Sequence, residues 1–249
     1  MSVAGTSRSG DEASVAIVTG AGRGIGRAIA LEFARAGYSL CLAARSRDEL
    51  EETRSQSGLP VERALIVLVD LATEEAPDLL IDAALDCYGR VDVLVNNAGW
   101  APPRTPLLKM RPADVDRMIA VNLRAPIALT RLAAAAMTPR GIGTIVNIAS
   151  SAAVKAPAGE AVYVATKAAL IAFTRAAFHE MRQSGLKLSV IVCGLVDTAL
   201  IPNNKRLDRA AMLSADDVAR AVMQIVNSPA GACPVEVTLE PQIDPERPH

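Results

Sequence analysis

The chain has 249 residues, of which 51% are hydrophobic and 21% charged, and its formal net charge at pH 7 is −1. This composition predicts a folded protein with a full core, and the balanced charge argues against a basic surface for nucleic acid or acidic membranes. The two histidines, with no C-x-x-C pair and no G-x-S-x-G motif, argue against a metal centre or a histidine-dependent hydrolase.

Short apolar runs alternate with helical patterns along the chain. The predicted strands are Ser14–Thr19, Ser39–Ala44, Ala64–Val69, Val91–Val95, Gly143–Ile148, Lys187–Val192 and Val235–Leu239. The predicted helices are Gly24–Ala36, Arg47–Ser57, Thr73–Tyr88, Pro112–Thr138, Glu160–Gln183 and Ala215–Asn227. Because the strands are continuous hydrophobic runs, both faces of the sheet should be covered. We predict a single-domain α/β Rossmann fold over residues 14–240, with a doubly wound parallel sheet of about seven strands.

The two ends of the chain are polar, and we expect residues 1–13 and 241–249 to be flexible tails. The first segment lacks the apolar stretch of a secretory signal, and no apolar run approaches the ~18 residues of a transmembrane helix. The four cysteines are scattered: Cys41, Cys87, Cys193 and Cys233. Free thiols are typical of a reducing compartment, so we expect a cytoplasmic protein.

The turn after the first strand reads T-G-A-G-R-G-I-G and opens a helix. Gly20, Gly24 and Gly26 would let the backbone turn tightly and approach a pyrophosphate at the helix N-terminus. The spacing is G-x-x-x-G-x-G, not the commoner G-x-G-x-x-G. An ordinary glycine-rich turn is the alternative, but the flanking strand and helix favour a dinucleotide site.

The end of the second strand bears on which dinucleotide binds. An acidic residue there would bind a ribose 2′-hydroxyl and favour NAD, but residues 43–46 read Ala-Ala-Arg-Ser. Arg45, and Arg23 in the glycine turn, could instead pair with a 2′-phosphate. We therefore predict NADP(H) as the cofactor; the alternative is that both arginines are solvated surface side chains.

A phenol and an ammonium are expected side by side later in the chain. Tyr163 and Lys167 lie four residues apart in a predicted helix and so share one face. A lysine cation favours tyrosinate, so we expect Lys167 to lower the pKa of Tyr163 from its usual value of about 10. The pair alone is weak evidence, because Y-x-x-x-K occurs by chance in many helices.

The glycine turn, N-N-A-G at Asn96–Gly99 and Tyr163-x-x-x-Lys167 together resemble the short-chain dehydrogenase/reductase family from Val15 to Thr198. The resemblance implies that Asp70 accepts a hydrogen bond from the adenine amino group, that Val196 contacts the nicotinamide carboxamide, and that Thr198 bonds cofactor phosphate or amide. The cofactor-binding residues implied are Gly20, Arg23, Gly24, Ile25, Gly26, Arg45, Asp70, Leu71, Asn97, Ala98, Gly99, Tyr163, Lys167, Val196 and Thr198.

The same resemblance implies a catalytic set of Asn122, Ser150, Tyr163 and Lys167, with Ser150 favoured over the adjacent Ser151. Ser150 and Tyr163 would hold a carbonyl oxygen while the cofactor supplies hydride, and Tyr163 would then act as general acid. Lys167 would also hold the nicotinamide ribose, and Asn122 would position a water that links Lys167 to solvent. An asparagine inside a helix is locally unfavourable, which supports a polar role there.

Residues after the sixth strand are expected to shape the substrate side. Cys193 stands where the family usually has proline, and a reactive thiol there lacks a cationic partner in the sequence. We expect a lid at Ala199–Leu213, where Lys205, Arg206 and Arg209 could meet an acidic or carrier-bound substrate or form a solvated surface. Trp100, the only tryptophan, could line the pocket rim or serve as packing.

The predicted function is therefore an NADP(H)-dependent oxidoreductase that interconverts a carbonyl and an alcohol on a small molecule. A 3-ketoacyl thioester reductase and a non-catalytic NADP-binding regulator are the alternatives. The C-terminal sequence lacks the V-D-G-G-like strand of ketoacyl reductases, which favours a small aldehyde, ketone or hydroxy acid. The resemblance implies a homodimer or homotetramer through the helices bearing Asn122 and Tyr163, and we expect neither nucleic acid nor membrane as a partner.

Overall fold

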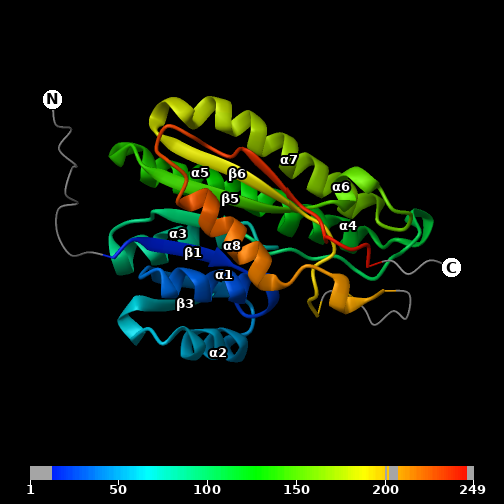
Figure 1. The fold of residues 1–249 in the computed structure, drawn as a ribbon, viewed down its shortest axis with the longest axis horizontal. Helices are drawn as coiled ribbons and strands as arrows, with labels where there is room; N and C mark the ends of the chain where they lie inside the picture. Colours follow the sequence, from blue (N-terminus) through cyan, green and yellow to red (C-terminus); the bar gives the residue numbers. More distant parts are fainter. Residues whose placement is uncertain (1–12, 200, 202–206, 246–249) are drawn as a thin grey trace.

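The computed structural model describes residues 13–199, 201 and 207–245. A parallel sheet of seven strands is at its centre, in the order β3-β2-β1-β4-β5-β6-β7 (Figure 1). The strands are β1 (Val15–Thr19), β2 (Ser39–Ala44), β3 (Ala64–Leu68), β4 (Val93–Asn96), β5 (Gly143–Ser150), β6 (Leu186–Cys193) and β7 (Glu236–Leu239). The chain therefore reverses direction across the sheet between β1 and β4, which is where open α/β sheets bind ligands.

Helices cover both faces of this sheet. They are α1 (Gly24–Arg35), α2 (Arg47–Ser57), α3 (Ala76–Tyr88), α4 (Pro112–Ile119), α5 (Ala125–Met137), α6 (Ala152–Lys155), α7 (Ala161–Met181) and α8 (Ala215–Val226). On one face α1 packs against α2 and α8, and on the other α5 packs against α3 and α7. The α/β Rossmann architecture and the parallel sheet of seven strands are thus confirmed.

Residues of β1 divide the core into two layers. Ala16 and Val18 face the cluster that includes Phe33 of α1 and Val222 of α8, while Ile17 faces the cluster that includes Leu129 of α5. All these side chains are buried. The alternation follows from the two-residue period of a strand, and it explains why β1 reads as a continuous apolar run.

The long helix predicted at Pro112–Thr138 is interrupted. Its middle, Ala120–Arg124, forms a π-helical turn between α4 and α5. Single π turns inside α-helices recur at functional sites, and here the turn contains Asn122. The spacing of apolar residues is helical throughout this stretch, so it could not predict the interruption.

The C-terminal segment also differs from the expected flexible tail. The backbone N–H of Asp208 donates to the carbonyl of Pro245 at 2.8 Å, and Pro245 is buried. Residues up to 245 are therefore held against the segment that follows β6. The expected tails at 1–12 and 246–249 lie outside the described residues.

Two helical stretches are long and apolar enough to cross a membrane by length and composition alone, Pro112–Arg140 and Ala161–Ser184. The expectation that the chain has no transmembrane helix was based on uninterrupted apolar runs, and it stays a prediction. Helices that pack against a core pass the same test, and both stretches here pack against the sheet or its other helices.

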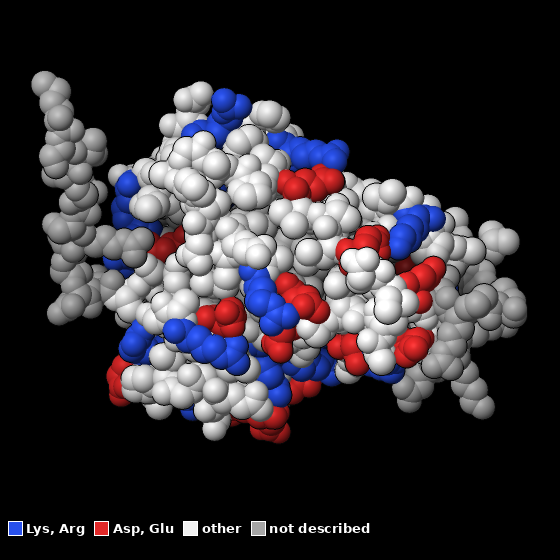
Figure 2. Space-filling view, viewed as in Figure 1, with Lys and Arg blue, Asp and Glu red and all other residues white. Residues whose placement is uncertain are grey.

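On the face shown in Figure 2, basic and acidic side chains are interspersed.

Candidate active site

The glycine turn connects β1 to α1, at the carboxyl edge of the sheet. Gly20 and Gly24 have positive φ angles of 66° and 53°, which side chains rarely adopt. A Cβ atom at Gly26 would lie 2.1 Å from the carbonyl oxygen of Gly20. The turn can therefore close this tightly only with glycine at these positions, as the sequence predicted.

The N-terminus of α1 suits a pyrophosphate. Arg23 is its N-cap residue and makes no side-chain capping bond to the first turn. Uncapped N–H groups and the helix dipole attract anions, so this turn fits the dinucleotide that the sequence predicts. Ile25 packs its side chain against the core, which holds the turn on the sheet.

Thr19 joins the glycine turn to the segment after β4, and the sequence analysis missed this residue. Its hydroxyl oxygen accepts hydrogen bonds from the N–H groups of Asn97 and Ala98, both at 3.0 Å. The amide of Asn97 in turn donates to the carbonyls of Thr19 at 2.8 Å and Gly20 at 3.4 Å. These bonds bring Asn97, Ala98 and Gly99 next to the turn, as expected for residues of one cofactor site.

Asp70 and Leu71 follow β3 at the same edge of the sheet. Leu71 is buried, whereas the Asp70 carboxylate pairs with Arg117 of α4 at 2.9 Å. Burial opposes ionisation, but the N–H of Ala72 and the Arg117 guanidinium outweigh it and hold the pKa of Asp70 below its usual value. Arg117 also lies over the ring of Trp100, 5.5 Å from its centroid. Arg117 thus links the expected adenine side to the substrate side, a contact that no sequence motif indicated.

Arg23 has an acidic neighbour that the sequence analysis did not consider. Its guanidinium lies 3.3 Å from the carboxylate of Glu49, which projects from the first turn of α2. Arg45 is exposed at the end of β2. The second strand does lack an acid, as predicted, but α2 supplies one to the same region, so Arg23 is not a free cation.

Ser150 ends β5, and its hydroxyl lies close enough to the phenol of Tyr163 on α7 to act on the pKa of that phenol. Desolvation raises the pKa of Tyr163 above its usual value, and the Ser150 hydroxyl offsets this only in part. Glu160 and Cys193 add to the increase. The expectation that Lys167 lowers this pKa is therefore wrong for this geometry. Desolvation of the phenol is the largest influence on this pKa, and the Lys167 Nζ lies 5.9 Å from the centroid of the Tyr163 ring.

Lys167 is buried, with 5% of its surface exposed, and its Nζ donates to the carbonyl of Ile148 at 2.9 Å. Burial lowers the pKa of Lys167 to about 8. The ammonium faces the segment after β4, since a Cβ atom at Gly99 would lie 3.7 Å from Nζ. Ser150, Tyr163 and Lys167 thus converge at the sheet edge, beside the cofactor turn.

Asn122 is fully buried in the π turn, and both ends of its side chain are bonded. Its Oδ1 accepts from the N–H of Trp100 and its Nδ2 donates to the carbonyl of Trp100, both at 2.8 Å. Nδ2 also lies 3.4 Å from the Thr166 hydroxyl. A polar task for Asn122 is confirmed, and that task is to hold the backbone of Trp100; the proposed water link to Lys167 stays a prediction.

The segment after β6 returns to the glycine turn. A Cβ atom at Gly24 would lie 3.4 Å from the Thr198 side chain, so Thr198 lies against the start of α1. Val196 is buried and forms a bridge with Leu213. Arg209 bonds the carbonyls of Ile201 and Thr198 and pairs with Asp197. Arg209 therefore stabilises the expected lid through these contacts. Lys205 and Arg206 lie outside the described residues.

Cys193 lies closer to the catalytic set than the sequence suggested. It pairs in register with Ser150, and the Lys167 ammonium acts on its thiol. Burial nevertheless raises the pKa of Cys193 to about 12, so the thiol stays protonated at neutral pH. Among the residues that the structure describes, no three histidine, cysteine or acidic side chains are grouped to hold a metal ion.

Comparison with known proteins agrees with this architecture. The family model described as short chain dehydrogenase matches residues 14–208, and the chain belongs to that family. A metagenomic short-chain oxidoreductase solved in complex with NADP is 33% identical, with 93% of this chain and 99% of that chain covered and a TM-score of 0.81.

Two other solved structures are similar. One is the 3-ketoacyl-(acyl-carrier-protein) reductase from Brucella melitensis complexed with NADH. It is 27% identical, with 93% of this chain and 98% of that chain covered and a TM-score of 0.85. The other is serine dehydrogenase from Escherichia coli, which is 27% identical, with 91% of this chain and 97% of that chain covered and a TM-score of 0.80. These proteins share the fold and differ in cofactor and substrate, so the family leaves both open for this chain.

Proposed function

We propose that this protein is an NADP(H)-dependent oxidoreductase that interconverts a small ketone or aldehyde and the corresponding alcohol. The Ser150 hydroxyl next to the Tyr163 phenol, together with the buried Lys167 and the glycine turn at the start of α1, carries the proposal. Ser150 and Tyr163 offer two hydroxyls to one carbonyl oxygen, where negative charge develops in the transition state. The nicotinamide group supplies the hydride when bound.

Tyr163 is the proton donor in the reduction direction. Its raised pKa keeps the phenol protonated at neutral pH, which is the form that a general acid requires. The Ser150 hydroxyl lies beside the phenol and acts on its pKa. Lys167 supplies a buried positive charge that would lie beside the forming alkoxide and the bound cofactor.

The test is the variant Tyr163→Phe, which removes one oxygen and keeps the ring. We expect kcat to fall by about 10²- to 10⁴-fold with the Kd for NADPH nearly unchanged, because the lost group acts on the substrate proton. Turnover of a panel of ketones, aldehydes and ketoacyl thioesters is followed by loss of NADPH absorbance. Tyr38→Phe, which keeps the contact between that ring and Phe33, is the control. A Tyr163→Phe enzyme with wild-type kcat would refute the mechanism.

NADP(H) rather than NAD(H) is part of the proposal. Arg23 lies in the glycine turn and Arg45 at the end of β2, where an adenine ribose would be bound, and both are exposed enough to meet a 2′-phosphate. The similar oxidoreductase solved with NADP supports this choice, and the reductase solved with NADH is the reason to test it. A higher kcat/KM with NADH than with NADPH would overturn it.

A 3-ketoacyl thioester reductase is the second candidate, supported by the similar Brucella enzyme. We favour a small substrate because the last strand and the residues after it lack the V-D-G-G-like sequence typical of ketoacyl reductases. We also propose a cytoplasmic homodimer or homotetramer in which α4, α5 and α7 meet the same helices of a second copy. A non-catalytic regulator would lack turnover with every substrate of the panel.

A further inference from the structure

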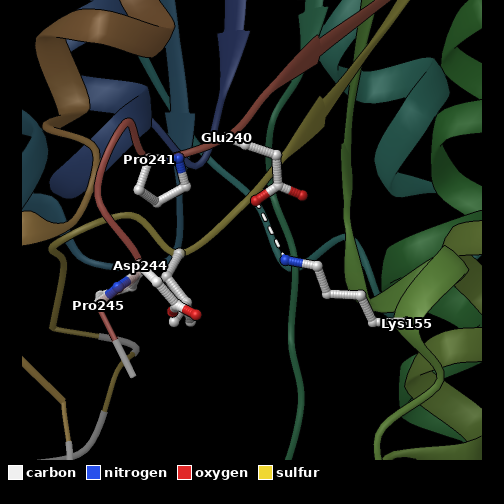
Figure 3. Close-up of a pocket in the computed structure, with 6 residues that line it drawn as sticks. Lys155, Glu240, Pro241, Asp244 and Pro245 are labelled. Carbon is white, nitrogen blue, oxygen red and sulfur yellow. Dashed lines mark hydrogen bonds and ion pairs between the residues drawn. The ribbon is translucent and has the colours of Figure 1, made fainter. Parts of the chain in front are cut away.

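The chain that connects Ser150 to Tyr163 is fixed to other segments by two ion pairs. The first joins Lys155, the last residue of α6, to Glu240 after β7, with Nζ 3.1 Å from Oε2 (Figure 3). The second involves Glu160, the residue directly before α7. Glu160 is the closer of the two attachment points to Tyr163 along the chain, so its charge bears on the chemistry of the phenol.

Arg104 is the partner of Glu160. Its Nε lies 2.5 Å from Glu160 Oε1, and the two side chains are 67% and 21% exposed. The backbone reinforces this contact, because the N–H of Thr105 donates to the carbonyl of Gly159 at 3.0 Å. Gly159 has a φ of 83°, and a Cβ atom there would lie 3.4 Å from the Cβ atom of Arg104. The ion pair therefore forms where two backbone segments lie against each other.

The position of Glu160 places its charge near the catalytic phenol. Glu160 is the N-cap residue of α7, and Tyr163 follows three residues later in the first turn of that helix. Residues three apart lie on the same side of a helix. The Glu160 side chain makes no capping bond and accepts a hydrogen bond from Arg104 instead. Its negative charge raises the pKa of Tyr163, because a carboxylate opposes a second negative charge close to it.

Two other ionisable side chains lie near Tyr163. Burial raises the pKa of the Cys193 thiol to about 12, so that thiol is uncharged at neutral pH. The Lys167 ammonium lies 5.9 Å from the centroid of the Tyr163 ring. Among the described groups that act on the pKa of the phenol, Glu160 is therefore the negative one at neutral pH. The strength of its effect depends on how far Arg104 neutralises it.

From this geometry we propose that Arg104 is a positioning residue for the reaction: by holding and neutralising Glu160, it sets the pH range in which Tyr163 exchanges its proton with the substrate. The proposal rests on the proposed oxidoreductase function and adds a residue to it. Without Arg104, the carboxylate would strengthen the hold of the phenol on its proton and oppose the negative charge on the substrate oxygen. An ion pair this exposed contributes little to stability, so its loss should change the pH profile rather than the fold.

The test makes opposite charge changes in the same ion pair and follows carbonyl reduction at saturating NADPH. Arg104→Met should move the alkaline break of the kcat/KM profile to higher pH, and Glu160→Gln should move it to lower pH, each by about 0.3–1 pH unit. At pH 8, kcat/KM should fall about 2-fold in Arg104→Met and rise about 2-fold in Glu160→Gln, because the rate follows the acid strength of the phenol in part.

Two further variants separate charge from structure. Arg104→Lys keeps the positive charge and should keep the wild-type profile. The double variant of Arg104→Met and Glu160→Gln should match Glu160→Gln alone, because no carboxylate is left to neutralise. Lys155→Met is the matched control, since it removes the ion pair at the end of α6 and leaves the charges near Tyr163 in place (Figure 3). We expect the wild-type profile from it.

A second measurement requires no turnover. The sequence has three tyrosines, so protein labelled with ¹³C at the tyrosine Cζ atoms gives three signals, and the one missing in Tyr163→Phe belongs to the catalytic phenol. Its chemical shift, followed against pH in the cofactor-free protein, should titrate later in Arg104→Met and earlier in Glu160→Gln than in wild type. The signal thus reports the effect of Arg104 on Tyr163 independently of any substrate.

Shifts in the same direction for Arg104→Met and Glu160→Gln, a shift of equal size in Lys155→Met, or unchanged signals together with unchanged rates at pH 8 would refute the role of Arg104. The oxidoreductase function would survive that result, provided that wild type turns over the carbonyl panel and Tyr163→Phe does not. Absence of turnover in wild type would refute the function, and the ¹³C titration would still decide whether Arg104 acts on Tyr163.

Discussion

Lys167 is buried, and burial raises the free energy of its charged form. The unfolded chain holds that proton with a pKa of about 10.5, whereas burial lowers the folded value to about 8. Between these values the unfolded state binds more protons, so the free energy of unfolding should rise with pH from about 8 to about 10.5. Below pH 8 both states are protonated and the whole cost of burying the ammonium is present.

Lys167→Met should therefore stabilise the fold at pH 7 while impairing function. The shift corresponds to about 3 kcal/mol as an upper estimate, because the variant also loses the bond to Ile148. We expect a higher Tm at pH 7, a gain that shrinks as pH approaches 10, weaker NADPH binding and little turnover. A Tm below wild type at pH 7 would contradict the prediction. Lys187→Met, which removes a lysine bound to Ser228, is the comparison.

Glu49 competes with a 2′-phosphate for the Arg23 guanidinium. Glu49→Gln should remove that competition and the like-charge repulsion, and so lower the Kd for NADP⁺ by about 3- to 10-fold with little change for NAD⁺. Glu51→Gln, on the same helix but paired with Arg54 and Arg47, is the control. Titration of Trp100 fluorescence measures both constants. Weaker NAD⁺ binding in Glu49→Gln would mean instead that Glu49 binds the ribose hydroxyls.

The sequence predicted the residues whose chemistry depends on backbone geometry. Gly20, Gly24 and Gly26 could be placed because only glycine fits such a turn. Glu49 and Arg117 could not, since their roles depend on which way a helix face points after it packs. The pKa of Tyr163 was predicted in the wrong direction for the same reason: the spacing to Lys167 was known, but the burial of the phenol was not.

At the scale of elements, the π turn between α4 and α5 positions Asn122 against Trp100. The extra residue in such a turn shifts the helix face, and here the shifted side chain is the one that is fully buried and bonded twice. The sequence predicted the strands to within a few residues, but α3 begins at Ala76 rather than Thr73. Residues before it form a turn in which the N–H of Thr73 donates to Asp70.

Asn122→Ala should loosen the loop that Trp100 begins. Loss of two buried hydrogen bonds is expected to lower the free energy of unfolding by about 2–4 kcal/mol. Because Trp100 is the only tryptophan, its emission should shift to longer wavelength in the folded variant. Thr166→Val removes only the 3.4 Å contact and should change both readouts less. An unchanged emission maximum would argue against Asn122 as the anchor.

For the whole molecule, self-association is the property that most needs measurement. Four alanines of α7 (Ala165, Ala168, Ala172 and Ala176) are exposed along one stripe, and Ile119 and Ile127 are exposed on α4 and α5. Such small and apolar faces allow close helix approach between copies. We expect a mass of two or four times 26.1 kDa in solution.

Ala168→Arg should break this contact, because a long cation would have to be buried between helices. The expected result is a mass of 26.1 kDa by light scattering, with an unchanged circular dichroism spectrum. Ser55→Arg places the same side chain at an exposed position of α2 and should leave the assembly intact. If wild type is itself a monomer at micromolar concentration, the proposed assembly is wrong.

The hydrogen bonds between Thr19 and Asn97 join segments 78 residues apart, so the cofactor site closes only after β2, α2, β3 and α3 have been accommodated between them. During refolding, the ability to bind a dinucleotide should therefore appear late, together with the sheet, rather than early with the glycine turn. A peptide that ends before β4 should bind no dinucleotide at all. Bound cofactor, in turn, should slow amide exchange in the central strands and not only around the turn.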